Sequence, residues 1–232
     1  MKAELVKRET LSPDDRAQMF ALFSAHYIPE NSELFNRDLS QKDWVILLRD
    51  EASTEIVGFS SLAIFGDNVN DRPVLVVYSG DTIVKEQARS APHLARAWIR
   101  AVLELTKGEV LPVYWLLLCG GYKTYRFLPV FFRSFFPRFD RQESDALAKL
   151  RAQLCTKRFG TQYISDRGIV RFEHGATPLR PGVADIPHQR LSDPHIKFFA
   201  KQNPGWHLGD ELACIASLEV DNFSEAGLRM VR

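Results

Sequence analysis

The chain has few cysteines, no excess of charge of either sign and no long apolar run. Its 232 residues include only three cysteines, Cys119, Cys155 and Cys214, an odd number that lie far apart. This spacing fits neither a disulfide framework nor a zinc knuckle. No two of the six histidines stand at metal-ligand spacing with a third ligand nearby, so we expect no metal.

The charge balance and the hydropathy pattern restrict the class of protein. Thirty Lys and Arg residues face 29 Asp and Glu residues, and the net charge is +1. Dedicated nucleic-acid binders carry a basic excess, so we expect no nucleic-acid partner. The longest nearly uncharged apolar stretch, residues 110–121, is too short to span a bilayer, and the first residues contain no apolar signal segment. We therefore expect a cytoplasmic protein without a membrane span; its oligomeric state is left open.

What is present is typical of a folded globular protein. Hydrophobic residues make up 45% of the chain, charged residues 25% and aromatic residues 11%. Residues 44–65 read as a β-hairpin, and residues 74–84 and 113–118 as two further strands separated by a helix over 89–107. This order predicts an α/β fold in which the two strands pair in parallel across the helix.

Glycine interrupts the strand predicted over residues 74–84. A glycine inside a strand often accompanies a β-bulge or a close approach by another group. We therefore expect the strand to be irregular at Gly80. In a regular strand Tyr78 and Asp81 would point to opposite faces of the sheet, whereas a bulge would bring them to the same face.

The junction between this strand and the next helix has the features of an anion site. Helix N-termini present unpaired backbone N–H groups and the positive end of the helix dipole, which suit a phosphate. The segment from Val84 to Leu94 forms such a junction, and Arg89 would add a charge-assisted contact.

This layout resembles that of the GNAT superfamily of N-acetyltransferases. In that family a strand ends in a valine and, five residues later, an arginine or glutamine opens a loop of the form R/Q-x-x-G-x-G/A before a long helix. Val84 and Arg89 stand at that spacing, while Pro92 and Leu94 occupy the glycine places. The resemblance covers residues 4–139 and lies in spacing and element order; the coenzyme A loop is degenerate.

The resemblance implies a fold and a co-substrate. The fold would be a mixed, mostly antiparallel central sheet with a splayed parallel strand pair and flanking helices, formed by residues 1–139. Residues 140–232 would be an α+β C-terminal extension packed on that core. The co-substrate would be acetyl-CoA or another acyl-CoA, with backbone of Ile83 and Val84 on its pantetheine arm. Its diphosphate would be wrapped by Arg89, Ser90, Ala91, His93 and Leu94.

Direct acyl transfer to an amine needs a base for the amine and an acid for the leaving thiolate. In the resembled family these are often a carboxylate near the middle strand and a tyrosine early in the helix after the next strand. Asp81 is the only carboxylate in the strand over 74–84, and Tyr125 lies one turn into a helix predicted over 122–136. The competing interpretations are an exposed strand-end aspartate and a packed tyrosine whose hydroxyl bonds a backbone carbonyl.

Three functions remain open, and the aromatic residues over 122–136 bear on one of them, the transfer of a long acyl chain. Phe127, Phe131 and Phe135 recur at helical spacing and form either core or a groove for a long acyl chain. The main hypothesis is an acyltransferase that moves an acyl group from acyl-CoA to an amine of a small molecule or peptide. The alternatives are an acyltransferase with an acyl carrier protein or long-chain donor, and a catalytically inactive binding protein.

Overall fold

The computed structural model describes residues 1–28, 32–69, 71–88, 92–141, 145–172, 178–183 and 185–231. Within them one eight-stranded sheet has the order β1-β2-β3-β4-β5-β8-β7-β6. Its strands are β1 (Lys2–Lys7), β2 (Trp44–Arg49), β3 (Ile56–Val69), β4 (Arg72–Val84), β5 (Val113–Cys119), β6 (Tyr163–Ile164), β7 (Ile169–Val170) and β8 (Glu211–Ser217). Of the described strand pairs, β4 and β5 run parallel and all others antiparallel.

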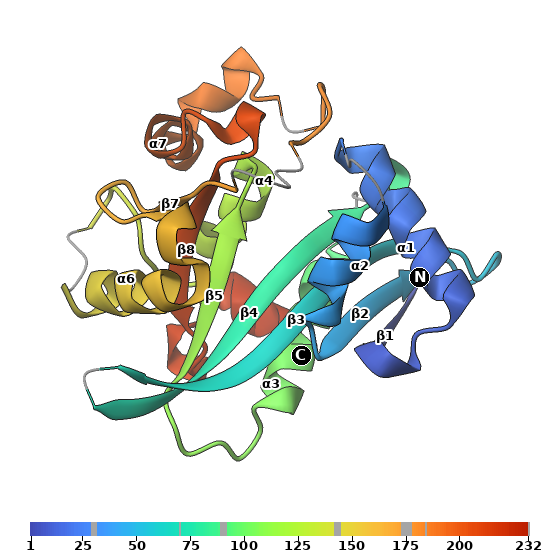
Figure 1. Ribbon diagram of the computed structural model, residues 1–232, viewed down its shortest axis with the longest axis horizontal. Coiled ribbons are helices and arrows are strands. Elements are labelled where there is room, and N and C mark those ends of the chain that lie inside the picture. Colours follow the sequence, from blue (N-terminus) through green and yellow to red (C-terminus); the bar gives the residue numbers. More distant parts are fainter. Residues whose placement is uncertain are drawn as a thin grey trace.

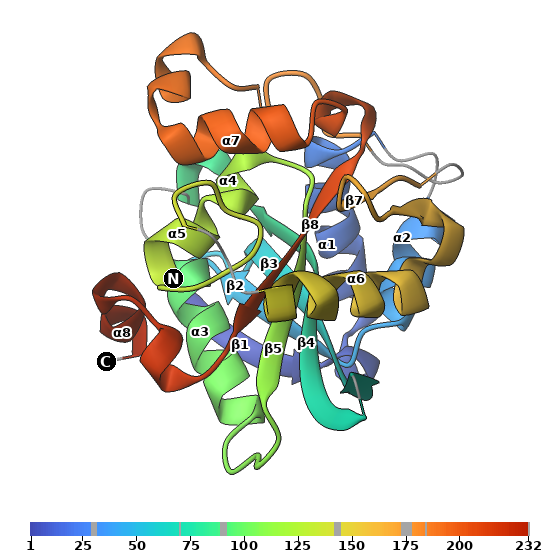
Figure 2. The same cartoon turned by 90° about the vertical axis from the view of Figure 1, so that its left-hand side faces the viewer.

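Helices cover both faces of the sheet. Helices α1 (Pro13–His26), α2 (Ser32–Ser40) and α6 (Asp145–Phe159) lie on one face, and α3 (His93–Leu105) and α8 (Glu225–Val231) lie on the other (Figure 2). The short helices α4 (Tyr122–Tyr125) and α5 (Phe127–Phe131) follow β5, and α7 (Pro194–Gln202) packs near α4. This mixed sheet with one parallel pair confirms the predicted fold class, and the predicted hairpin over 44–65 is present as β2 and β3.

The hydrophobic core consists of three clusters. The cluster under α3 contains Trp98, Val102 and Trp115, that under α6 contains Leu150, Leu154 and Cys155, and that under α1 and α2 contains Met19, Phe23 and Phe35. Because both faces of β4 and β5 are covered, these strands are apolar on both sides, which is why their sequences read as continuous hydrophobic runs.

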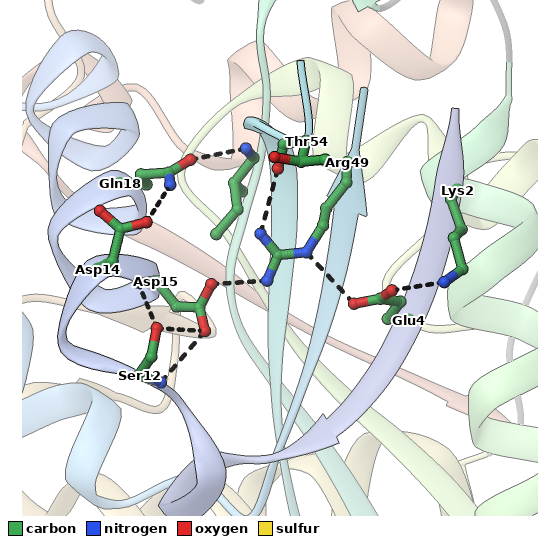
Figure 3. A network of polar contacts seen from close by, with 9 residues as sticks. Lys2, Glu4, Ser12, Asp14, Asp15, Gln18, Arg49 and Thr54 are labelled. Carbon is green, nitrogen blue, oxygen red and sulfur yellow. Dashed lines mark hydrogen bonds and ion pairs between the residues drawn. The ribbon is translucent and has the colours of Figure 1, made fainter. Parts of the chain in front are cut away.

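A polar network holds α1 against the outer strands (Figure 3). The Ser12 hydroxyl accepts from the Asp15 backbone N–H, and the Asp15 carboxylate accepts from the Ser12 backbone N–H, so the two form a capping box. Arg49 of β2 donates from Nη2 to Asp15 Oδ1 over 2.6 Å and from Nε to Glu4 Oε2 over 3.3 Å. These contacts tie β1, β2 and the first turn of α1 together.

The single helix predicted over residues 122–136 is wrong. The segment forms α4 and α5 and is extended at Phe132, where α5 has ended. The Phe136 N–H donates to the Ile215 carbonyl over 2.8 Å, and the Ile215 N–H donates back over 2.7 Å. Pairing with β8 therefore replaces helical hydrogen bonds.

Residues from the C-terminal third complete the central sheet. Strand β8 pairs antiparallel with β5 over Tyr114–Cys119, and β7 and β6 extend the sheet beyond it. None of the described helices is both long and apolar enough to cross a membrane.

Candidate functional site

The two parallel strands part at their carboxyl ends (Figure 1). Pairing between β4 and β5 runs from Leu75 opposite Val113 to Ser79 opposite Leu117. Beyond Ser79, β4 remains paired with β3 as far as Val84, but no described strand pairs with its other edge. A strand edge without a partner presents N–H and C=O groups that an extended ligand can bind.

A cavity of about 720 Å³ occupies this divergence. Its walls include residues from both faces of the sheet, with Leu94 and Trp98 of α3 on one side and Asp38 of α2 and Arg158 of α6 on the other. The cavity therefore passes through the gap between β4 and β5. We call the part on the α2 and α6 face the acidic half, and the part on the α3 face the aromatic half.

The predicted irregularity at Gly80 is confirmed as a β-bulge. Ser60 is paired with Thr82 and Leu62 with Ser79, so one residue of β3, Ser61, faces two residues of β4. The extra residue reverses the alternation of β4. As a result Tyr78 and Asp81 both line the cavity.

The space beside Gly80 in this bulge is filled by a lysine side chain. A Cβ atom at Gly80 would overlap Lys42 Cε and Ser61 Oγ, so a larger residue would force these side chains to move. The Lys42 side chain is 0% exposed, and its Nζ donates to Asp38 Oδ2 over 2.6 Å. This ion pair, between a buried lysine and a partly exposed aspartate, places a positive charge behind the bulge.

Replacing Gly80 with alanine should lower the free energy of unfolding by about 1–3 kcal/mol, because the new methyl overpacks the bulge. Urea unfolding would measure this change. Gly66→Ala in β3 is the matched control, since a Cβ there meets nothing within 4 Å, and its effect should stay within about 0.5 kcal/mol. Equal stabilities of the two variants would contradict this account of Gly80.

Two carboxyl groups meet in the acidic half. Burial, together with the nearby Asp38 charge, raises the pKa of Asp81 to about 7, and Lys42 opposes this shift. Burial and the charges of Asp81 and Asp38 raise the pKa of Glu211, at the start of β8, to about 8. Carboxyl groups with such pKa values exchange protons near neutral pH, as a general base must.

Two tyrosines complete the acidic half. Burial is the main cause that raises the pKa of Tyr27 and of Tyr78, with added contributions from Glu211 and Asp81. Tyr78 is 7% exposed, and its ring lies 4.3 Å from the Arg158 guanidinium carbon and 5.5 Å from Lys42 Nζ. Both tyrosines line the cavity.

The aromatic half is built around a buried serine. The Ser79 hydroxyl, on a residue 2% exposed, accepts hydrogen bonds from the indole N–H groups of Trp98 over 3.2 Å and Trp115 over 2.7 Å. Phe127 packs edge-on against both indoles. This wall is apolar and fits a hydrocarbon or thioester segment better than a charged one.

The predicted cofactor residues are placed in part. Ile83, Val84 and Leu94 line the cavity, and His93 is exposed as the first residue of α3. Arg89, Ser90 and Ala91 lie outside the described residues. Pro92 stands at the N-cap of α3, lines the cavity and has no N–H to donate. The first amides inside α3 have no intrahelical acceptor, so this end of the cavity suits an anionic group.

The structure does not bring Tyr125 to the cavity. Its side chain is 0% exposed, and its hydroxyl donates to the Pro137 carbonyl over 2.9 Å. The ring packs among Phe135, Phe198 and Phe199. This is the packed-aromatic alternative, and it arises because the chain turns at Arg126 between α4 and α5.

Most of the phenylalanine face is core. Phe131, Phe132 and Phe135 are buried, and Phe132 packs against Phe223 with the ring centroids 5.0 Å apart. Of the three phenylalanines in the predicted row, Phe127 lines the cavity.

A segment of the C-terminal third covers the cavity. Residues 178–183 lie across the end of α1, where Tyr27 bridges to Leu179 and the Arg180 N–H donates to the His26 carbonyl over 2.8 Å. On the other side Lys123 Nζ donates to the Val183 carbonyl over 2.7 Å. Leu179 and Val183 form part of the cavity wall.

The sequence did not point to Asp38, Arg158 and Glu211, three charged residues that line the cavity, or to Lys42 behind the bulge. No local motif surrounds them. Glu211 reaches the cavity because β8 inserts beside β5, where its Oε1 lies 3.3 Å from the Cβ position of Gly120. The sequence offered one signal for the strand that carries Glu211. The strand over 113–118 is apolar throughout, which indicates a central position in the sheet with a neighbouring strand on each side. Among the described residues, no group of three or more His, Cys, Asp or Glu is placed to hold a metal ion.

A comparison with models of known protein families found no match, and neither did a search of curated proteins. Among solved structures, a conserved protein from Enterococcus faecalis described as a probable N-acyltransferase is similar at 16% identity and a TM-score of 0.40, covering 54% of this chain and 31% of that one. A GNAT family N-acetyltransferase (YhbS) from Escherichia coli in complex with CoA has 17% identity and a TM-score of 0.39, covering 55% and 68%.

A Saccharomyces cerevisiae N-myristoyltransferase with bound myristoyl-CoA has 19% identity and a TM-score of 0.41, covering 51% of this chain and 29% of that one. The chain thus spans less than a third of the length of the yeast protein and of the E. faecalis protein. At this level of similarity, the description of the fold rests on the sheet topology given above.

Proposed function

We propose that this protein transfers an acyl group from a coenzyme A thioester to an amine. The observation that carries the proposal is the cavity through the gap between β4 and β5, which joins the N-terminal end of α3 to two carboxyl groups of raised pKa. One side of this passage suits an anionic thioester donor, and the other suits an amine that must lose a proton.

The donor would be held by groups of this chain along its whole length. The amide end of α3 would face its phosphates, and the open edge of β4 at Ile83 and Val84 would pair with its amide groups. The donor supplies an activated acyl carbon. Trp98, Trp115 and Phe127 would surround the acyl chain and exclude water.

Asp81 is our candidate for the base, and Tyr78 replaces Tyr125 as the candidate acid. Asp81 would accept the proton of the attacking amine as the C–N bond forms and the C–S bond breaks. Tyr78 would donate its hydroxyl proton to the leaving sulfur and regain one from solvent. The bulge at Gly80 supports this pairing because it turns both side chains into the cavity. Positioning of the two reactants would supply much of the rate.

Tyrosine-to-phenylalanine variants separate the two tyrosines. Tyr78→Phe should lower kcat about tenfold or more while KM changes little, because proton donation acts in the transition state. Tyr125→Phe should leave kcat unchanged and cost about 1 kcal/mol of stability, the value of one lost hydrogen bond. Steady-state kinetics and thermal unfolding measure both. A kcat defect confined to Tyr125→Phe would reverse the assignment.

The proposal is tested by following thiol release from acetyl-CoA and from acyl-CoA of increasing chain length with a panel of primary amines. We expect release that depends on the amine, and an N-acyl product by mass spectrometry. Titration of each thioester by calorimetry separates failure to bind from failure to react. Binding without turnover would favour a catalytically inactive binding protein, and absence of binding would overturn the proposal.

A longer acyl group or a carrier-protein donor is the second candidate. Pro92 at the head of α3 and the aromatic wall of the cavity favour it, since the first weakens a phosphate site and the second accommodates methylene groups. Retention on immobilised acyl carrier protein without heat of binding to coenzyme A would select this donor.

A further inference from the structure

The acidic half of the cavity holds charged groups of both signs that the described part of the chain leaves without an ion-pair partner. The side-chain carboxyl groups of Asp81 and Glu211 form no ion pair or hydrogen bond with any described residue. Arg158 stacks on the rings of Phe65 at 5.0 Å and Tyr78 at 4.3 Å, and it too has no acidic partner among the described residues. All three charged side chains line the cavity.

The other cations at or near the cavity have partners or are exposed. Lys123 lines the cavity and donates to the Val183 carbonyl, while Lys42, which lies behind the bulge and outside the cavity wall, is paired with Asp38. Arg37 reaches the cavity wall from α2 but is exposed. Arg158 is therefore the half-buried guanidinium that an anion entering the cavity would meet.

Tyr78 links the two kinds of charge. The side chain is 7% exposed, and its hydroxyl has no hydrogen-bond partner among the described residues although it lines the cavity. Besides burial, Glu211 and Asp81 raise the pKa of this hydroxyl and Arg158 lowers it, so all three charged groups lie close enough to act on Tyr78. One small molecule in the cavity can therefore contact a carboxyl group and Arg158 at the same time.

We propose that the acceptor is a zwitterion, an amine that also carries a carboxylate or phosphate. Its nitrogen would lie at Asp81 and Glu211, and its anionic group at Arg158. The inference rests on the proposed function, because it names the acceptor of that same site.

The chemistry of each group supports this assignment. A guanidinium presents two parallel N–H donors to a carboxylate or phosphate and is held flat by the two rings against which it stacks. A site built to pair a charged group discriminates against the analogue that lacks it, because its own group is then left without a partner. An amine without an anionic group would leave Arg158 without a partner.

The experiment compares amines that differ in the anionic group alone. The pairs are phenylalanine with phenethylamine and leucine with isopentylamine for a carboxylate, and O-phosphoethanolamine with ethanolamine for a phosphate. Calorimetric binding to the full chain is measured beside thiol release from acyl-CoA. We expect the anionic member of at least one series to bind and to react at least about tenfold better in kcat/KM.

Variants of α6 assign the effect to one residue. Arg158→Gln should bring the ratio of kcat/KM between the anionic and the uncharged member to about one, whatever change both members share through the contact with Tyr78, and Arg158→Lys should retain part of the preference. Lys157→Gln is the matched control, because this neighbouring cation is 71% exposed and pairs with Asp67 outside the cavity. Its preference should equal that of the unaltered protein.

The outcomes separate this inference from the proposed function. A binding preference that Arg158→Gln abolishes, without any acyl transfer, would retain the zwitterion site and refute the transferase. Acyl transfer that uses both members of every pair equally would support the transferase and refute the zwitterion site. An equal loss for both members in Arg158→Gln, or neither binding nor turnover with any amine, would overturn the inference.

Discussion

Asp81→Asn should lower kcat at least about a hundredfold with little change in KM, the loss typical of removing a general base. Asparagine has nearly the same shape but cannot accept a proton at neutral pH. Because the pKa of Asp81 is about 7, kcat/KM of the unaltered protein should rise with pH and level off above that value. The variant should lack this rise.

Glu211→Gln is the comparison within the same cavity. It removes a neighbouring carboxyl but leaves Asp81, so the rise in kcat/KM near pH 7 should persist. Stopped-time assays from pH 5 to 9 with saturating donor would show it. If Asp81→Asn retained kcat within threefold, or if the pH rise survived in it and vanished in Glu211→Gln, the base would have to be reassigned to Glu211.

The Asp81→Asn substitution should also make the protein more stable at high pH. The folded state raises the pKa of Asp81 from 3.8 to about 7, so between these values the folded protein binds a proton that the unfolded chain has lost. Stability therefore falls as pH rises through this window and is unaffected below it. The asparagine side chain would remain neutral throughout, and we expect a gain of about 1–2 kcal/mol at pH 8, part of the roughly 4 kcal/mol that a three-unit shift represents.

Asp140 provides a control of opposite sign. Hydrogen bonds from Arg138, each 2.6 Å long, lower the pKa of Asp140 to about 2. Its contribution to stability is present above the unfolded pKa of 3.8 and is lost only as pH falls toward 2, so Asp140→Asn should destabilise at pH 8. Urea titrations of both variants at pH 4 and pH 8 measure these changes. Destabilisation by Asp81→Asn at pH 8 would show that its carboxylate is paired rather than strained.

Local patterns in the chain were sufficient for much of the fold. The Ser12 capping box, the hairpin of β2 and β3 and the parallel pairing of β4 with β5 depend on residues close in sequence or on one right-handed crossover. The prediction of one helix over 122–136 was wrong because the structure of this segment depends on residues that are distant in sequence. Its apolar spacing fits a helix, but the pairing of Phe136 with Ile215 depends on a strand that lies far along the chain.

The candidate site divides in the same way. Asp81 and the irregularity at Gly80 could be predicted from the sequence of one strand, because that strand is otherwise apolar and contains a single carboxylate next to a glycine. Tyr125 lies outside the cavity, and the sequence could not indicate this because the direction of its side chain depends on where α4 ends. Glu211 and Arg158 come from elements with no motif of their own.

From its sequence alone, this protein could be expected to form a mixed sheet in which a long helix connects two parallel strands. Asp81 could be placed near the end of the first of these strands. Those features follow from periodicity, which acts over a few residues. Only the tertiary structure decided that β8 enters beside β5, that Lys42 packs against the bulge at Gly80, and that Arg158, Asp81 and Glu211 line the same cavity. Charges interact through space and independently of chain order, so their arrangement is determined by packing.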